Sequence, residues 1–145
     1  MSKQRSIIDA LITALGTITG VNLVTEELEV WNNGDPSNYN MILIAPNKPE
    51  VERFSFLHPT SEDMAGTMDI TIEGNTYSQY KEDTKKVIDD LMVSVEKEIV
   101  TNTALNAYVV DIVLNQDEYV YDISDNFGLF SAVYTVEYLY NHLAP

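Results

Sequence analysis

Apolar and polar residues alternate with a period of two near the end of the chain. The even positions form a row of large apolar or aromatic side chains, broken by one alanine: Phe130, Ala132, Tyr134, Val136, Tyr138 and Tyr140. The odd positions are more polar: Leu129, Ser131, Val133, Thr135, Glu137 and Leu139. This period predicts a β-strand with one buried face. We expect the second face to be exposed or covered by a neighbouring molecule.

Two helices are predicted from apolar residues that recur every three or four positions. The first spans residues 3 to 15 and ends at Gly16, a residue typical of helix C-terminal caps. The second runs from about residue 78 to residue 100, with Thr76 and Gln79 spaced as in a capping box. Its apolar stripe lies opposite a face of lysine, glutamate and aspartate.

Shorter alternating runs predict the remaining strands: around residues 28–31, then 41–46, 51–59, 67–75, 105–114 and 118–123. The second and third of these strands are expected to pair through a turn at residues 46–49, and a turn at residues 115–117 separates the last two. Short turns favour antiparallel neighbours. The predicted fold is therefore α+β, a largely antiparallel β-sheet with two helices packed on one face, in a single domain of residues 1–145.

Composition narrows the function classes. The chain has 145 residues, 45% of them hydrophobic, and contains no cysteine, which excludes disulfides and thiolate chemistry. It has neither a signal-peptide pattern nor an apolar run long enough for a membrane helix, so we expect a soluble cytoplasmic protein. The formal net charge of −15 disfavours conventional nucleic-acid binding. Acidity can serve solubility, or it can keep a surface near DNA without binding it.

Candidate catalytic chemistry is sparse. His58 and His142 each fall at the end of a predicted strand, without a second histidine or a glutamate at ligand spacing. The six glycines are scattered and form no phosphate-binding loop. Carboxylates are abundant, but no pair stands out as a glycosidase-like acid and base. We therefore expect no enzymatic activity, no cofactor and no metal site, and we look to binding and assembly instead.

The order of elements has a known parallel. The chain has an early helix closing in "ALGTITG", a block of strands, and the helix "YKEDTKKVIDDLMVSVEKEI". It ends with "LNAYVVDIVL" and "AVYTVEYLYNHLAP". In this order and pattern, over nearly its whole length, the chain resembles the tail-terminator (tail-completion, or minor tail) proteins of long-tailed bacteriophages. The loop "VWNNGDPSNYN" and the low basic content depart from the family.

The resemblance implies a structural virion protein without catalytic activity. Tail terminators form a hexameric ring at the head-proximal end of the tail tube, stop its polymerisation and join the tail to the head. The implied partners are other copies of the chain, the tail tube protein and a head-completion or neck protein. DNA passes through such a ring without specific binding, and no membrane is involved. The implied location is the tail or neck of the virion, after synthesis in the host cytoplasm.

Loop residues are the candidates for interface or lumen contacts: Trp31, Tyr39, Glu62, Asp63, Asp117 and Glu118. The four acidic residues are expected to reach the lumen or the tube, and the two aromatic residues to reach a neighbour or the head side. Other interpretations remain open. They are another phage neck component (a head-closure or adaptor protein), an acidic DNA mimic that inhibits a nucleic-acid-binding protein, and a small carboxylate enzyme.

Overall fold

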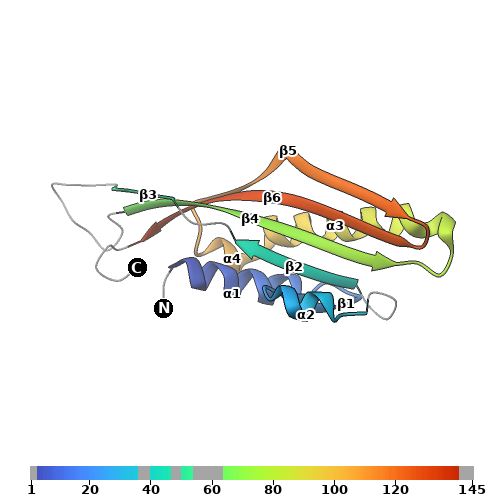
Figure 1. Cartoon of the computed structure of the whole chain (residues 1–145). Coiled ribbons are helices and arrows are strands. Elements are labelled where there is room, and N and C mark those ends of the chain that lie inside the picture. Colours follow the sequence, from blue (N-terminus) through green and yellow to red (C-terminus); the bar gives the residue numbers. More distant parts are fainter. Residues whose placement is uncertain (1–2, 36–39, 47–49, 54–63, 141–145) are drawn as a thin grey trace.

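The computed structural model describes residues 3–35, 40–46, 50–53 and 64–140, and for residues 50–53, 64 and 116–120 it describes the backbone alone. The elements follow one another as α1 (Lys3–Leu15), β1 (Val21–Thr25), α2 (Leu28–Asn32), β2 (Asn40–Pro46), β3 (Glu50–Arg53), β4 (Met64–Tyr77), the 3-10 turn η1 (Lys81–Asp83), α3 (Thr84–Thr101), α4 (Thr103–Asn106), β5 (Asp111–Ser124) and β6 (Phe127–Tyr140). Figure 1 shows the long strands lying along the helices. The predicted α+β class is confirmed.

One curved sheet organises the molecule. Its strand order is β1-β2-β4-β6-β5, and β3 pairs with β4 outside this path. All pairs are antiparallel except β1 with β2, which is parallel. The last strand, β6, therefore lies inside the sheet, with β4 on one side and β5 on the other. The helices cover only one side of this strand, which accounts for the period of two in its sequence.

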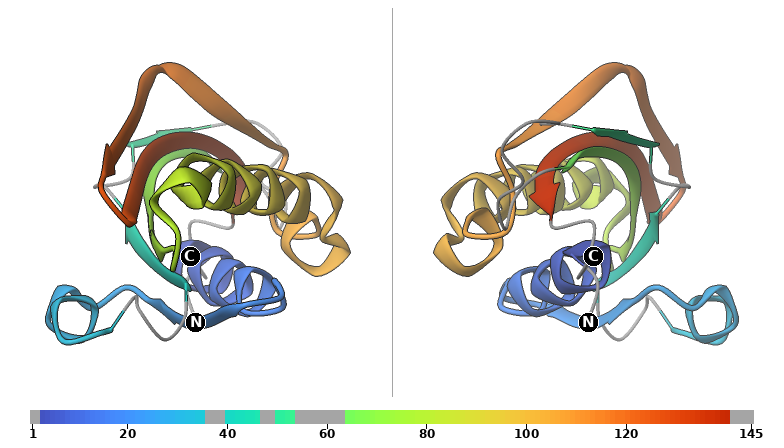
Figure 2. Two further views of the ribbon diagram at one scale, coloured as in Figure 1. Left: turned by 90° about the vertical axis from the view of Figure 1, so that its right-hand side faces the viewer. Right: turned by 90° about the vertical axis from the view of Figure 1, so that its left-hand side faces the viewer.

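The two long helices, α1 and α3, lie on the concave side of the sheet, as Figure 2 shows in end view. The first helix was predicted with its correct bounds. Each helix buries one apolar stripe, and these stripes meet the even row of β6 and the inward residues of β2 and β4 in one core. The predicted inward row of the last strand is confirmed, because each of its six side chains is 8% exposed or less.

Two glycines of β4 shape the inner face of the sheet. Gly74 lies opposite Phe130, and Gly66 lies opposite Tyr138. A Cβ atom at Gly66 would lie 2.5 Å from Cζ of Tyr138, and one at Gly74 would overlap the ring of Phe130. The rings of β6 therefore occupy the space above the glycines. This is how a narrow two-helix core accommodates large aromatic side chains.

The predicted pairing of strands 41–46 and 51–59 is wrong. Both β2 and β3 pair with β4 instead, β2 along residues 70–75 and β3 along residues 64–67. The 14 residues of β4 provide room for both strands end to end, and β2 and β3 are therefore not partners of each other. Residues 54–59 of the predicted strand lie outside the described residues.

The strand predicted at residues 28–31 is the helix α2, and the strand in this region is β1. The hydroxyl of Thr25 accepts a hydrogen bond from the Glu27 amide, and the Glu27 carbonyl accepts one from the Trp31 amide. These bonds end the strand and begin a helical turn. Four alternating residues fit either structure, so the pattern alone favoured the wrong one.

The long helix begins later than predicted. Residue Thr76 is buried in β4 and caps no helix; α3 begins at Thr84 after η1. The hydroxyl of Thr84 donates to the Asp125 carbonyl, at 2.8 Å, in the turn between β5 and β6. The start of α3 is therefore fixed by a tertiary contact, which a local capping pattern does not reveal.

The segment of residues 105–123 also differs from the prediction. Its first residues belong to α4, whose N-cap Asn102 accepts a hydrogen bond from the Leu105 amide. The two predicted strands are one strand, β5, whose register shifts between Asn115 and Val120. A bulge takes the place of the predicted turn, and Figure 1 shows the resulting bend.

Candidate assembly surfaces

The side of β4, β6 and β5 that points away from α1 and α3 is called the outer face here. Its side chains alternate with the inner row and include Thr67, Asp69, Thr71, Glu73, Asn75, Asp111, Val113, Asp122, Leu129, Ser131, Thr135 and Glu137. Val133 also points to this side but is buried, at 8% exposed. Val113 and Leu129 are 53% and 39% exposed on it. The outer face is thus a broad surface that mixes apolar and polar groups, with no described helix over its centre (Figure 2).

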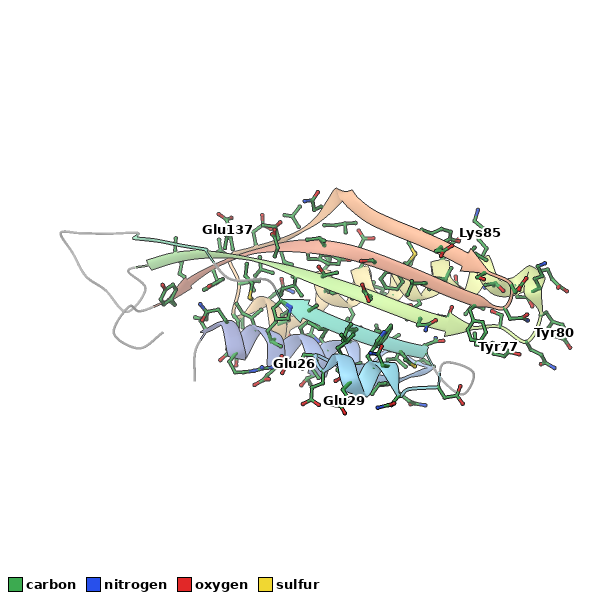
Figure 3. All side chains as sticks on the ribbon, viewed as in Figure 1. Glu26, Glu29, Tyr77, Tyr80, Lys85 and Glu137 are labelled. Atoms are coloured by element: carbon green, nitrogen blue, oxygen red, sulfur yellow. The ribbon has the colours of Figure 1, made fainter. Side chains whose placement is uncertain are left out.

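Charge is distributed unevenly between the two sides of the protomer. The outer face carries carboxylates, and among the described residues it carries no lysine or arginine: Asp69, Glu73, Asp111, Asp122 and Glu137. The described basic side chains belong to α1, η1 and α3: Lys3, Arg5, Lys81, Lys85, Lys86 and Lys97. In Figure 3, Glu137 projects from the sheet on the side away from the helices.

Two of these carboxylates face each other across a strand pair. Asp111 of β5 lies directly opposite Glu137 of β6, and Val113 follows on the same face opposite Thr135. Side chains at opposed positions have Cβ atoms about 4.5–5.5 Å apart, and like charges there are destabilising. Asp69 is held by the Thr135 hydroxyl, which donates to its Oδ1 at 2.8 Å. This part of the sheet keeps a concentration of negative charge that folding alone does not require.

One end of the sheet is covered on the outside. Met41 and Leu43 point to the side opposite the main core, yet they are buried, because α2 and the residues after it lie against β1 and β2. Gly34 permits this approach, since a Cβ atom there would lie 2.7 Å from Sδ of Met41. Figure 2 shows α2 on the outer side of this edge.

An ion-pair network joins α1 to the segment that leads into α2. The guanidinium group of Arg5 lies 2.7 Å from Oδ1 of Asp9 and 2.7 Å from Oε1 of Glu26. Hydrogen bonds to Asp9 and then Glu26 raise the pKa of Arg5 above its usual value. All three side chains are partly exposed, so the network orients α2 more than it stabilises the fold. Figure 3 shows Glu26 and Glu29 on this side.

The hairpin between β5 and β6 forms the right-hand tip of the molecule in Figure 1. Asn126 donates to the Ser78 carbonyl at 2.7 Å and its own carbonyl accepts from the Ser78 amide at 2.8 Å. Tyr77 and Phe127 form a tilted ring pair with centroids 5.3 Å apart. An open groove of about 410 Å³ runs beside them, lined by Asn75, Asp122, Ser124, Phe127, Gly128 and Leu129. This end is fixed by hydrogen bonds and presents exposed aromatic surface.

The structure describes part of the sequence-predicted site. Trp31 is half-buried on α2, while Tyr39, Glu62 and Asp63 lie outside the described residues. Asp117 and Glu118 fall within the register shift of β5, where the backbone leaves the regular ladder. Their roles stay predictions, and the structure does not bring these residues together with Trp31.

Sequence reasoning missed the outer-face carboxylates as a group. The alternation of residues 67–75 already placed Asp69 and Glu73 on the outward side, and the last strand placed Glu137 there. That these carboxylates share one surface follows only from the register of β4, β6 and β5, which the sequence does not give. The available signal was the absence of lysine and arginine from the outward positions of these strands.

No group of histidine and carboxylate side chains suited to a metal ion occurs within the described ranges. None of the described helices combines the length and the apolar character that a membrane crossing requires. No protein-family model matches this chain, and no curated protein matches its sequence. A function must therefore be argued from the fold and the surfaces above.

Proposed function

We propose that this chain is a structural protein of a bacteriophage tail, which forms a ring at the head-proximal end of the tail tube. There it terminates tube polymerisation and joins the tail to the head. The observation that carries the proposal is the outer face, a broad and mixed surface on a protomer whose helices cover the other side of the sheet. Such a half-covered sheet suits a subunit that meets other subunits.

The acidity of the chain supports the same role. A wall of carboxylates around a channel repels phosphates, so DNA slides past without being retained. Six copies would carry a formal charge of about −90, which opposes ring closure at low ionic strength. Assembly is therefore expected to strengthen when salt or a divalent cation screens the charge.

Sedimentation velocity of the purified chain tests the ring, at low salt and again with added magnesium. We expect a hexamer, with a larger assembled fraction in magnesium. The functional test is the polymerisation of purified tail tube protein with and without the chain, followed by electron microscopy. The expected result is shorter tubes with a ring at one end. Tubes of unchanged length and bare ends would contradict the proposal.

A second candidate, an acidic DNA mimic, is favoured by one specific observation. The lysines of α3 do not interrupt the carboxylates of the outer face, since they lie on the opposite side of the sheet. Alternate residues along a strand are about 6.6–6.8 Å apart, a spacing near that of phosphates. Competition with duplex DNA for a basic DNA-binding protein discriminates: a mimic displaces the DNA, and a ring protein does not.

A further inference from the structure

Helix α3 carries a second stripe, opposite the one it buries. The core stripe consists of Ile88, Leu91, Val95 and Ile99. The residues pointing away from it recur at spacings of four and three: Lys86, Asp90, Val93, Lys97 and Val100. We call this set the α3 outer stripe. Val93 and Val100 are each 64% exposed, and valine is not a favoured residue on a solvated helix surface.

The charges of the α3 outer stripe flank its apolar residues. Lys97 lies between the two valines, and no described side chain pairs with its ammonium group. Lys86 is bound to Asp90, with 2.7 Å between Nζ and Oδ2, which raises the pKa of Lys86. Asp89 and Glu96 border the stripe. Lys97 is therefore the charged group of this stripe that is left to meet a carboxylate of a partner.

The outer face has a matching centre. Val113 is 53% exposed there, with Asp111 beside it on β5 and Glu137 and Asp69 on the neighbouring strands. The α3 outer stripe thus presents two valines with Lys97 between them, and the outer face presents Val113 beside opposed carboxylates. Apolar centres with complementary charges at the rim are the usual anatomy of a specific interface.

The two surfaces point in opposite directions. The core stripe of α3 packs on the inner side of the sheet, so its outer stripe faces away from the sheet, while the outer face faces away from α3 (Figure 2). Two complementary surfaces on opposite sides of one protomer cannot satisfy each other within that protomer. They can do so only head to tail between copies, which gives a closed ring or an open filament.

We infer that the outer face around Val113 binds the α3 outer stripe of the neighbouring copy. The inference rests on the proposed ring and names the two surfaces that would form it. The contact places Val93 and Val100 against Val113 and brings Lys97, which lies between the two valines, near Asp111 and Glu137. The pairing also gives a reason for the like charges opposed on β5 and β6, since Lys97 of the neighbour compensates them.

Two charge-reversal variants test the pairing. The helix variant is Lys97→Glu, and the sheet variant combines Asp111→Lys and Glu137→Lys. Each should lower the apparent association constant at least about tenfold in sedimentation, because like charges then meet at the contact. The sheet variant is the sharper one, since it reduces the net negative charge from −15 to −11 and would otherwise favour association.

Mixing the two variants supplies the decisive result. In an alternating ring, the glutamates of the helix variant meet the lysines of the sheet variant, and every second contact is wild type. An equimolar mixture should therefore recover assembly that neither variant shows alone. Matched controls reverse charges elsewhere, namely Lys81→Glu for the helix variant and Glu29→Lys with Glu82→Lys for the sheet variant, and these should assemble like the wild type. Circular dichroism verifies that each variant is folded.

The other outcomes overturn the inference in distinguishable ways. If the variants assemble like the wild type, or if the mixture does not recover assembly, this pairing is refuted while the proposed ring still stands. If only binding to tail tube protein is lost in the sheet variant, the tube is the partner of the outer face. A wild-type chain that stays monomeric with salt, with magnesium and on tail tubes would remove both the pairing and the proposed ring.

Discussion

The two faces of the β4–β6 ladder differ more than any other two surfaces of the molecule. Along β6, the inner positions place mostly aromatic rings in the core, and the outer positions carry leucine, serine, threonine and glutamate together with the buried Val133. The inner face is closely fitted, to the point that Gly66 and Gly74 make room for the rings opposite. The outer face has open positions, opposed carboxylates and isolated valine and leucine side chains.

The two rows of side chains on β6 therefore have different roles, one in folding and one in contacts with other molecules. The inner row specifies the fold, because its side chains must fill the space between the sheet and two helices. Apart from the buried Val133, the outer row of β6 is more exposed than the inner row in the protomer, so most of its residues can define what the protein meets. Adjacent residues on one strand therefore offer matched pairs of substitutions, one for folding and one for association.

The largest expected effect comes from Phe130→Ala. The ring is 2% exposed and fills the space above Gly74, so its loss should destabilise the fold by about 3–5 kcal/mol. The neighbouring substitution Leu129→Ala, on the outer face, should cost less than about 1 kcal/mol. Urea unfolding followed by circular dichroism measures both. Equal losses would mean that the two faces are packed alike, contrary to the comparison.

A smaller effect is expected from Gly74→Ala. Alanine normally stabilises a strand relative to glycine, yet here its Cβ atom would overlap the Phe130 ring, so we expect a loss of about 1–3 kcal/mol. Glu73→Ala, one residue away on the outer face, should change stability by less than about 0.5 kcal/mol. The double substitution Gly74→Ala with Phe130→Leu should cost less than the sum of the singles. Strict additivity would show that the ring and the glycine do not share this space.

The inner face could be predicted from sequence because it is local. The period of two around residues 130–140 and the stripe of α3 each state which residues are buried, whatever their partners are. Strand pairing is not local: the proline-rich turn suggested a hairpin, and only the length of β4 shows that β2 and β3 share it. The start of α3 depends on the hairpin at Asp125 for the same reason.

The candidate surface was harder to predict than the fold. Residues in loops were favoured because loops often carry contacts. The outer-face carboxylates lie on regular strands, and Asp111 meets Glu137 only through a register that the bulge of β5 disrupts farther along. No pattern in the sequence encodes that register, so the opposed charges emerge from the structure alone.

A pH-dependent effect is expected at Tyr138. Its hydroxyl accepts a hydrogen bond from Nε2 of Gln4 at 2.8 Å, and burial raises the pKa of Tyr138 above its usual value. The folded protein therefore holds this proton more tightly than the unfolded chain, so the contribution to stability is complete below about pH 10 and declines as the pH rises further. Tyr138→Phe should lose about 1 kcal/mol at neutral pH and show a weaker alkaline decline.

Thermal unfolding of both proteins between pH 7 and pH 11 measures this effect, with Tyr80→Phe as an exposed control (Figure 3). The control should follow the wild type across the range. If the stability of Tyr138→Phe declines as steeply as that of the wild type at high pH, then Tyr138 is not the source of the alkaline sensitivity.

The smallest effect on the protomer, and the most telling for the outer face, is expected from Asp111→Asn. The substitution keeps the size of the side chain and the oxygen that accepts from the Ile112 amide at 2.9 Å, while it removes the charge opposed to Glu137. The folded protomer should gain about 0.2–0.5 kcal/mol from relief of the like-charge pair.

If a neighbour's lysine compensates this charge in the ring, the same substitution should weaken self-association. Stability of the protomer and association would then change in opposite directions, which a purely structural role for Asp111 does not produce. Denaturant unfolding at low protein concentration measures the stability of the protomer, and sedimentation at high concentration measures association. If both increase, or both decrease, Asp111 takes no part in the contact between copies.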